Sequence, residues 1–197
     1  MPAKAVFPDT TNFKTLSFRD IKSRLAQIYT SNKLNEKFLA QRWEFTLEST
    51  LLTRAQMAVA YGYVVQQNGE AETFRIVPPQ LGSTQGTMSG TVTCNADKAK
   101  GQSSVTATGG GGTFKKGDLI KFSNHTKVYQ LTADTTSDGS TAFTINIYPT
   151  LVTAITSGTT TAYNNVQMQV VLIEDTQQVR NDTKNLYKYK ITIREVY

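Results

Sequence analysis

The sequence predicts a mainly β chain with one α-helix, over about residues 53–68, and a small inserted all-β domain. Residues 42–48 alternate apolar and polar side chains, which is typical of a strand with one buried face. Thr53 and Gln56 have the spacing of a helix capping box. After Pro79 the composition shifts to Gly, Ser and Thr with frequent turn signals, which favours a separate β unit.

The stretch 40–79 is the expected centre of the fold. Its first strand points Trp43, Phe45 and Leu47 to one side. Apolar residues then follow at helical spacing: Met57, Ala60, Tyr61, Val64 and Val65. Asn68-Gly69 is expected to close the helix, because glycine tolerates the left-handed conformation of a C-terminal cap. A second strand is expected over 73–77, ended by two prolines.

The expected domain organisation is a core interrupted by an insertion. Residues 1–15 predict an extended N-terminal arm that becomes ordered only against a partner. Residues 16–82 plus 164–197 predict the β core, and residues 83–163 predict an inserted small all-β domain. The ends of an inserted domain lie close together as a rule, which suits two core strands on either side of it.

Residues 20–29 fit two structures. Ile21, Leu25 and Ile28 allow a helical turn, whereas Leu25, Ile28 and Tyr29 fit a strand with one slip. The polar, turn-rich segment 31–36 leads directly into the strand that contains Trp43, and two extended runs around a polar tip make a β-hairpin. The hairpin is favoured, and the helix remains an alternative.

The inserted domain shows short apolar runs separated by turns every 8–12 residues, around Gly117-Asp118, 123–125 and Asp138-Gly139. The four-glycine run 109–112 is interpreted as a loose connector, since a phosphate-binding loop needs a Gly-Lys pair that this sequence lacks.

Two further strands are expected near the C-terminus. Residues 166–173 end with apolar residues on both faces, which favours a central strand. Tyr187, Tyr189, Ile191 and Ile193 alternate with polar residues in a closing strand, which is expected to pair with 166–173 across the polar connection 175–185.

Charge and cysteine content set broad limits. The net charge is +6 and is spread evenly, so no dedicated nucleic-acid patch is predicted. Cys94 is the only cysteine, so no internal disulfide can form. No signal peptide and no apolar segment of about 20 residues are evident, which predicts synthesis in a cytoplasm and no membrane insertion by this chain.

No pattern predicts a catalytic, cofactor or metal site. His125 is the only histidine and lies in a turn-like segment, where an exposed or turn-structuring role is expected. Asp134 and Asp138 precede Gly139 without the ligand spacing of a calcium loop. Glu44 is interpreted as surface charge and Cys94 as a buried or idle thiol. The sequence therefore predicts no enzyme activity and no cofactor.

The sequence resembles a family of tailed-bacteriophage proteins. The resemblance rests on 42–45, on the Thr-Arg-Ala helix start, on Glu72-Thr73-Phe74 through Pro78-Pro79, on 117–123, and on the last strand through Tyr197. It covers most of 38–197 and is similar to the distal tail, or baseplate-hub, protein. Residues 1–37 match nothing recognisable.

This resemblance implies a fold and a role. The core would be a tail-tube-like β-sandwich or split barrel, and the chain would be a virion structural protein. It would form a homo-oligomeric ring, expected to be a hexamer, that joins the tail tube protein to baseplate or tail-tip proteins. The ring would continue the channel for DNA ejection, and DNA would pass through its lumen without sequence recognition.

The hairpin tip is the candidate contact between subunits, because sheet edges are templates for pairing. Its residues are Ser31, Asn32, Lys33, Leu34, Asn35 and Glu36. Two alternatives remain: a tail-completion or head–tail connector protein, and a receptor- or carbohydrate-binding tail module. The second predicts aromatic residues gathered on the loops of 83–163. A cell-wall hydrolase would need an acid/base pair that the sequence does not show.

Overall fold

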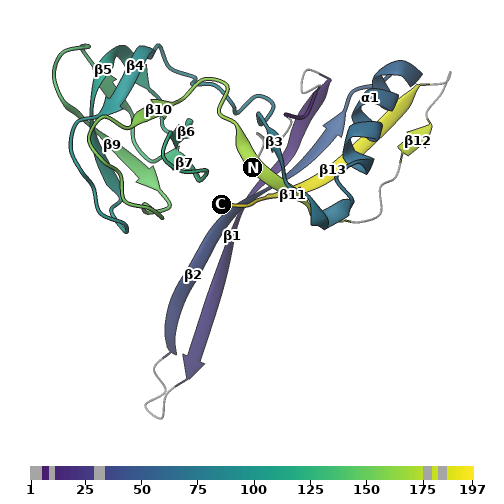
Figure 1. Ribbon diagram of the computed structural model, residues 1–197, viewed down its shortest axis with the longest axis horizontal. Coiled ribbons are helices and arrows are strands. Elements are labelled where there is room, and N and C mark those ends of the chain that lie inside the picture. Colours follow the sequence, from purple (N-terminus) through teal and green to yellow (C-terminus); the bar gives the residue numbers. More distant parts are fainter. Residues whose placement is uncertain (1–5, 9–11, 29–33, 175–178, 182–185) are drawn as a thin grey trace. The chain divides into compact units, whose positions relative to one another are not determined.

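The computed structural model describes residues 6–8, 12–28, 34–174, 179–181 and 186–197, and these form two compact units (Figure 1). The barrel unit comprises residues 1–11, 74–169 and 197, and the sheet unit comprises 12–73 and 170–196. Each unit has its own core. Among the described residues there is one α-helix, and strands dominate both units, which confirms the predicted mainly β fold.

The sheet unit is built on an antiparallel sheet. Its strands follow the order β1 (Phe13–Ile28), β2 (Leu34–Ser49), β13 (Tyr187–Glu195) and β11 (Met168–Leu172), and β12 (Val179–Asn181) also pairs with β13. The hairpin prediction is confirmed, because β1 pairs with β2 along its whole length and residues 20–28 are strand. The predicted pairing of the last strand with 166–173 is confirmed as well, in the register Val171 to Arg194.

One face of this sheet is the buried face that the alternation predicted. Phe18 of β1 stacks on Trp43 and Phe45 of β2, with ring centroids 4.5 and 4.8 Å apart. Aromatic rings in offset or tilted contact add about 0.5–1.5 kcal/mol beyond the area they bury. Tyr189 of β13 continues the face and contacts the ring of Tyr61, 5.8 Å away, on the helix.

Helix α1 (Arg54–Val65) begins where the capping box predicted. The Thr53 hydroxyl accepts from the backbone N–H of Gln56, and the Gln56 side chain accepts from the Thr53 backbone N–H, 3.0 Å away. The predicted apolar stripe is only partly buried: Ala60 and Val64 are buried, whereas Val65 is 50% exposed. Adjacent helical residues point about 100° apart, so one sheet face cannot cover both Val64 and Val65. A short 3-10 helix, η1 (Gly69–Ala71), follows.

The barrel unit closes a six-stranded antiparallel barrel. Its strand order is β4 (Ser89–Cys94), β10 (Thr160–Ala162), β6 (Leu119–Phe122), β7 (Val128–Leu131), β9 (Phe143–Tyr148) and β5 (Ser104–Phe114), and β5 pairs with β4 to complete the circle. β8 (Thr135–Ser137) adds to the far end of β5. Closure removes the free sheet edges that would otherwise promote aggregation. The predicted small all-β domain is therefore a barrel.

The barrel is filled by inward-facing apolar residues from five of its six strands, β10 being the exception. Val92, Val105, Phe122, Tyr129 and Ile145 are fully buried in one cluster. The hydroxyl of the buried Tyr129 accepts from the backbone N–H of Val152, 3.1 Å away, which satisfies its polar end inside the core.

The four-glycine run is a strand, and its interpretation as a loose connector is wrong. Residues 109–112 lie within β5, where Gly109 and Gly111 pair with β4 and Gly112 pairs with β8. A Cβ at Gly112 would lie 2.4 Å from the carbonyl oxygen of Thr87, and its φ is +114°. Glycine is required there because the backbone of residue 87 crosses β5 too closely for a side chain.

A short parallel bridge joins the described part of the N-terminal segment to β3 (Phe74–Ile76) in the barrel unit. Val6 bridges Arg75, and the backbone N–H of Phe7 donates to the Arg75 carbonyl, 2.8 Å away. Phe7 is buried, with its ring 6.4 Å from that of Phe74. The structure thus differs from a wholly free arm at Val6 and Phe7, and β1 starts at Phe13, inside the range predicted for the arm.

Candidate functional site

The β1–β2 hairpin is the most distinctive feature of the sheet unit (Figure 1). β13 pairs with β2 only over Glu44–Glu48, whereas β1 and β2 stay paired as far as Ile28 and Leu34. Residues 24–28 and 34–38 therefore form a two-stranded ribbon, paired only with each other within the described residues. At about 3.4 Å per residue, the ribbon extends on the order of 15–20 Å beyond Ser23.

A register shift lies at the base of this ribbon. The pairing slips between Ser23 and Arg24, so that Ser23 faces Ala40 and Arg24 faces Phe38. A bulge of this kind bends the ribbon and increases its twist. An isolated two-stranded ribbon gains little stability in water, so its length is better explained by a contact with another molecule than by the fold of this chain.

Three of the six predicted contact residues lie at the described end of the ribbon. Leu34, Asn35 and Glu36 are the first residues of β2 and pair with Ile28, Gln27 and Ala26. Ser31, Asn32 and Lys33 lie outside the described residues. The role of the six residues as a contact between subunits stays a prediction.

The polar face of the sheet contains a buried carboxylate with two arginine partners, which the sequence analysis did not predict. Glu44 is buried, with 7% of its surface exposed, and it accepts from Arg19, 3.3 Å away, and from Arg194, 3.1 Å away. Its interpretation as surface charge is wrong, because the two long guanidinium side chains cross over it from the neighbouring strands. Sequence alternation assigns Glu44 to a face but cannot say which side chains cover it.

Buried polar groups also tie β13 to β2 on the apolar face. Glu195 is fully buried, and its carboxylate accepts from the backbone N–H of Trp43, 3.2 Å away. The hydroxyl of Ser49 accepts from the backbone N–H of Tyr189, 2.9 Å away. These two buried hydrogen bonds help to hold the closing strand in register.

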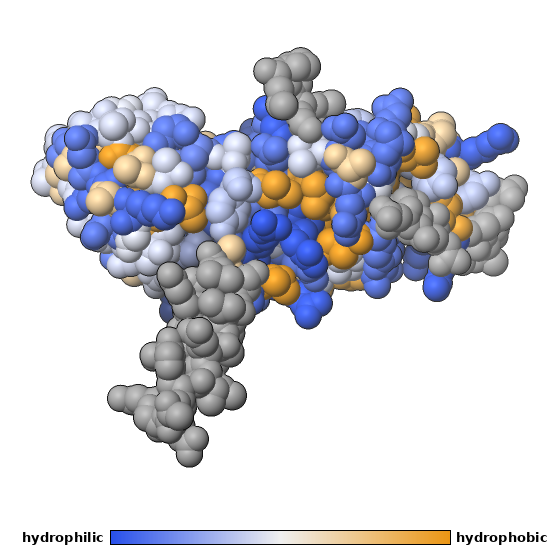
Figure 2. All heavy atoms as spheres, turned by 60° about the horizontal axis from the view of Figure 1, so that its bottom comes forward, coloured by the Kyte–Doolittle hydropathy of each residue, from blue (hydrophilic) through white to orange (hydrophobic). Residues whose placement is uncertain are grey.

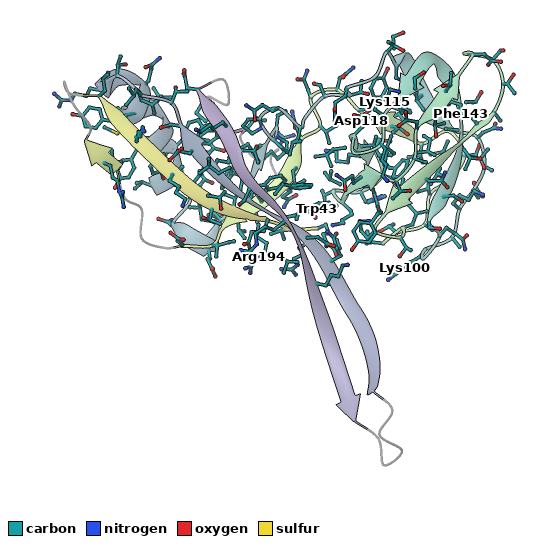
Figure 3. All side chains as sticks on the ribbon, turned by 180° about the vertical axis from the view of Figure 1, so that it is seen from behind. Trp43, Lys100, Lys115, Asp118, Phe143 and Arg194 are labelled. Atoms are coloured by element: carbon teal, nitrogen blue, oxygen red, sulfur yellow. The ribbon has the colours of Figure 1, made fainter. Side chains whose placement is uncertain are left out.

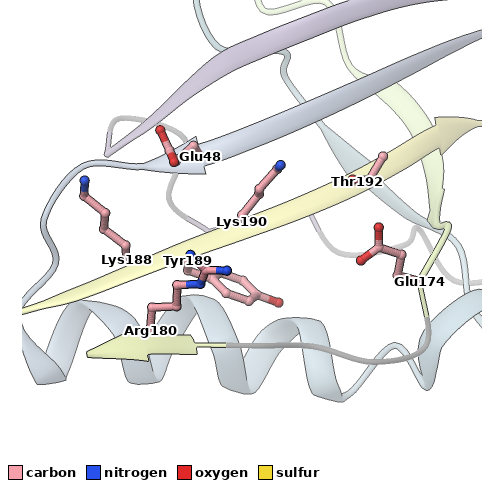
Figure 4. Close-up of a pocket in the computed structure, with 7 residues that line it drawn as sticks. All are labelled: Glu48, Glu174, Arg180, Lys188, Tyr189, Lys190 and Thr192. Atoms are coloured by element: carbon pink, nitrogen blue, oxygen red, sulfur yellow. The ribbon is translucent and has the colours of Figure 1, made fainter. Parts of the chain in front are cut away.

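A pocket of about 520 Å³ opens on the polar face beside β13 (Figure 4). Lys188, Lys190 and Thr192 line it from β13, and Arg180 lines it from β12. Glu48 and Glu174 contribute the two carboxylates, and Tyr189 completes the lining. The sequence analysis did not identify this pocket. The alternating lysines of the closing strand were the available signal.

In the barrel unit, Asp118 organises the turn before β6. It is buried and accepts from the Thr84 hydroxyl, and from the backbone N–H groups of Gln85 and Lys115, each 2.9 Å away. Figure 3 shows Asp118 and Lys115 side by side. Asp118 thereby fixes residues 84–85, where the chain enters the barrel, to the β5–β6 turn. This arrangement is structural, because the hydrogen bonds all come from nearby backbone and a threonine.

His125 has the turn-structuring role that was predicted. Its Nδ1 lies 2.7 Å from Asn124 Oδ1, and its Nε2 lies 2.8 Å from the Tyr129 hydroxyl. Because Val152 already donates to that hydroxyl, the Tyr129 proton is available for Nε2, and Nδ1–H donates to Asn124. Both contacts suit a neutral imidazole. Burial lowers the pKa of His125, and the nearby charge of Lys121 lowers it further.

Acid is expected to destabilise the barrel through His125. The unfolded chain takes up a proton near the ordinary histidine pKa, whereas the folded state resists it, so the stabilisation is present above that pKa and is lost as the pH falls below it. The measurement is the unfolding free energy from urea titrations between pH 7.5 and 5. The His125→Gln variant should show a smaller loss over this interval than the natural protein. Equal losses in the two proteins would contradict the assignment.

The remaining candidate residues have no arrangement that indicates chemistry. No group of three or more His, Cys, Asp or Glu side chains that could hold a metal occurs in the described parts of the chain. Asp138 accepts from the backbone N–H groups of Ser140 and Thr141, 2.8 and 2.7 Å away, which makes it a turn residue. Cys94 is buried, as one of the two predicted alternatives has it, and burial raises the pKa of its thiol to about 11.

Hydrophilic residues cover most of the side shown in Figure 2. No helix in the described part of the chain combines the length and the hydropathy needed to cross a bilayer.

Residues 83–166 match the protein-family model described as distal tail protein pb9, B domain. These residues contain the whole closed barrel. Comparison with curated proteins gives no match. Residues 83–166 therefore match the B domain of a phage distal tail protein, which confirms the family resemblance seen in the sequence and supports a structural role in a phage tail.

Proposed function

We propose that the protein forms a homo-oligomeric ring, most simply a hexamer, that joins the tail tube to the baseplate or tail tip and continues the DNA channel. The observation that carries the proposal is the distal-tail B domain, residues 83–166, in the same chain as a long hairpin. A permanent ring contact buries on the order of 2,000 Å² or more, and an extended ribbon supplies such area from few residues.

In this proposal the ribbon is the contact between neighbouring subunits. It presents backbone N–H and carbonyl groups along β1, which is the edge strand of the sheet order. An edge strand can add to a sheet of the next subunit, and head-to-tail contacts of this kind close into a ring when the rotation permits. Ser31 to Glu36 and the N-terminal arm would reach the neighbour, and the barrel would face outward as a contact for other tail proteins.

The receptor-binding alternative has less support. It predicted aromatic residues on the loops of the barrel. Of the six aromatic residues in question, none is exposed; they are Phe114, Phe122, Tyr129, Phe143, Tyr148 and Tyr163. These side chains serve the barrel core and its strands. The connector alternative has no specific observation in its favour.

The test is the oligomeric state of the natural protein and of a variant with a shortened hairpin. Because Ser23 faces Ala40, residues 24–39 can be replaced by Asn-Gly, which closes a two-residue turn between paired strands. Light scattering and negative-stain imaging should show a ring with a central hole for the natural protein and monomers for the variant.

Two controls make the test decisive. The single tryptophan, Trp43, reports through its fluorescence whether the shortened sheet unit remains folded. Incorporation into tails, measured in a phage complementation assay, covers the case in which the ring forms only on the growing tail. A folded variant that still forms rings would refute the role of the hairpin. A natural protein that forms no ring alone and enters no tail would refute the ring itself.

A further inference from the structure

The polar face of the sheet unit gathers positive charge from four strands. Pairing registers and alternation place six cations on this face: Lys14, Arg19, Arg42, Lys188, Lys190 and Arg194. Arg180 joins them through the pocket that it lines with Lys188. We name this the basic face. Cations from residue 14 to residue 194 meet there, which explains why charge counted along the sequence showed no block.

The carboxylates on the basic face do not balance its cations. Seven cations meet three carboxylates, Glu44, Glu48 and Glu174, which leaves a charge of +4 among the described residues of the face. Glu44 is engaged by Arg19 and Arg194, and Glu48 lies 3.4 Å from Lys14. Within the described residues, no carboxylate forms an ion pair with Arg42, Arg180, Lys188 or Lys190. These four side chains are exposed and available to an external anion.

The placement of these cations is regular. Lys188 and Lys190 are two residues apart on one strand, so their side chains leave the same side about 7 Å apart. Arg180 lies directly across from Lys188 in the β12–β13 pair. Figure 4 shows the side chains of Lys188 and Lys190 rising from β13 on the side of Glu48. The result is a charged surface whose pocket is lined mainly by polar side chains.

We propose that the basic face binds the phosphate backbone of double-stranded DNA without reading its sequence. Duplex DNA carries one negative charge per about 1.7 Å of its axis, and a flat array of lysine and arginine neutralises several phosphates while releasing their counterions. Lysine and arginine side chains that stand on strands suit contacts to phosphates, which position a duplex without reading its base edges. The inference deepens the proposed DNA channel, because it names the face that meets the DNA.

The test measures binding of a fluorescent 30-base-pair duplex by the full chain, through anisotropy, between 25 and 200 mM salt. The informative variant is Lys188→Gln with Lys190→Gln. Its matched control is Lys100→Gln with Lys116→Gln, which removes two exposed lysines from the barrel unit and changes the net charge equally. Far-ultraviolet circular dichroism and Trp43 fluorescence verify that all variants are folded.

The natural protein is expected to bind at low salt with an affinity that falls steeply as salt rises. The Lys188/Lys190 variant should bind about tenfold more weakly at 50 mM salt, and the slope of log affinity against log salt should fall by nearly two, since each phosphate contact contributes about 0.9. The control pair should change neither quantity by more than about twofold. Equal losses in both variants, or no binding at 25 mM salt, would overturn the proposal.

Polyglutamate serves as the second probe. Equal binding of polyglutamate and DNA, with equal sensitivity to Lys188 and Lys190, would assign the face to an acidic protein partner and would also overturn the proposal. The experiments can refute the DNA-binding inference and the proposed ring independently of each other. Rings without DNA binding would leave the ring intact and remove the inference, whereas DNA binding by a chain that never assembles would do the reverse.

Discussion

Gly112→Ala is expected to lower the unfolding free energy of the barrel by about 2–4 kcal/mol. The new Cβ would lie 2.4 Å from the carbonyl oxygen of Thr87 and 3.0 Å from the backbone nitrogen of Met88. Both obstacles are backbone, so no side chain can rotate away. The φ of +114° adds strain, because residues with a Cβ rarely adopt it. The clash of the new Cβ can be relieved only if the segment around residue 87 moves away from β5.

The control for this prediction is Gly111→Ala, one residue earlier in the same strand. A Cβ at Gly111 meets no atom within 4 Å, and its φ is not positive. Cys94 provides a reporter for the barrel alone, because its thiol is buried there and is the only one in the chain. Thiol-reagent labelling in a urea series should show the barrel opening at markedly lower urea in Gly112→Ala and almost unchanged in Gly111→Ala. Similar midpoints for the two variants would contradict the close-approach explanation.

The glycine run illustrates what a sequence leaves undetermined. Four consecutive glycines carry no periodicity and no side chain, so the pattern could not distinguish a connector from a strand. What makes 109–112 a strand is barrel closure, which brings β4 and β8 to the two parts of β5. That information lies in residues 17 to 25 positions away, as the pairs Gly109–Val92 and Gly112–Ser137 show. A glycine required by close backbone approach is evident only when the crossing backbone is known.

Local sequence patterns were sufficient to predict the strands and the helix that bury one face. The alternation over 42–48 and 187–194 predicted two strands, and the structure shows that these strands pair directly, Phe45 with Ile193 and Leu47 with Ile191. The capping box predicted the start of α1 to the residue. By contrast, the three-residue strand β12 lies within the segment interpreted as a polar connection. β12 pairs with β13 over three residues only, which are too few to show a strand alternation in the sequence.

The candidate site was predictable in outline only. The polar segment between two extended runs predicted a hairpin. The structure shows its two strands paired as far as Ile28 and Leu34. The basic face was not predictable, because its cations come from strands at both ends of the chain and become neighbours only through the β1-β2-β13 order. The burial of Glu44 was missed for the same reason: Arg19 and Arg194 lie 25 and 150 residues away in sequence.

Glu44→Gln is expected to lower the unfolding free energy of the sheet unit by about 1–3 kcal/mol. The substitution keeps the size of the side chain and one accepting oxygen but removes the charge that balances Arg19 and Arg194. The cost stays below that of a fully buried ion pair, because the Arg19 side chain is 64% exposed and water screens its charge. Trp43, adjacent in β2 and buried, reports unfolding of this unit through its fluorescence.

Glu48→Gln, on the same face of the same strand, is the control that shows how much of the cost at Glu44 is due to burial. The Glu48 side chain is 29% exposed, and its partner Lys14 is 51% exposed and 3.4 Å away, so this substitution should cost no more than about 1 kcal/mol. Added salt should reduce the small effect at Glu48 more than the effect at Glu44, because screening acts mainly on exposed charges. Equal costs at the two positions would mean that the two arginines do not depend on Glu44. The charge of the basic face would then be held in place by strand pairing alone.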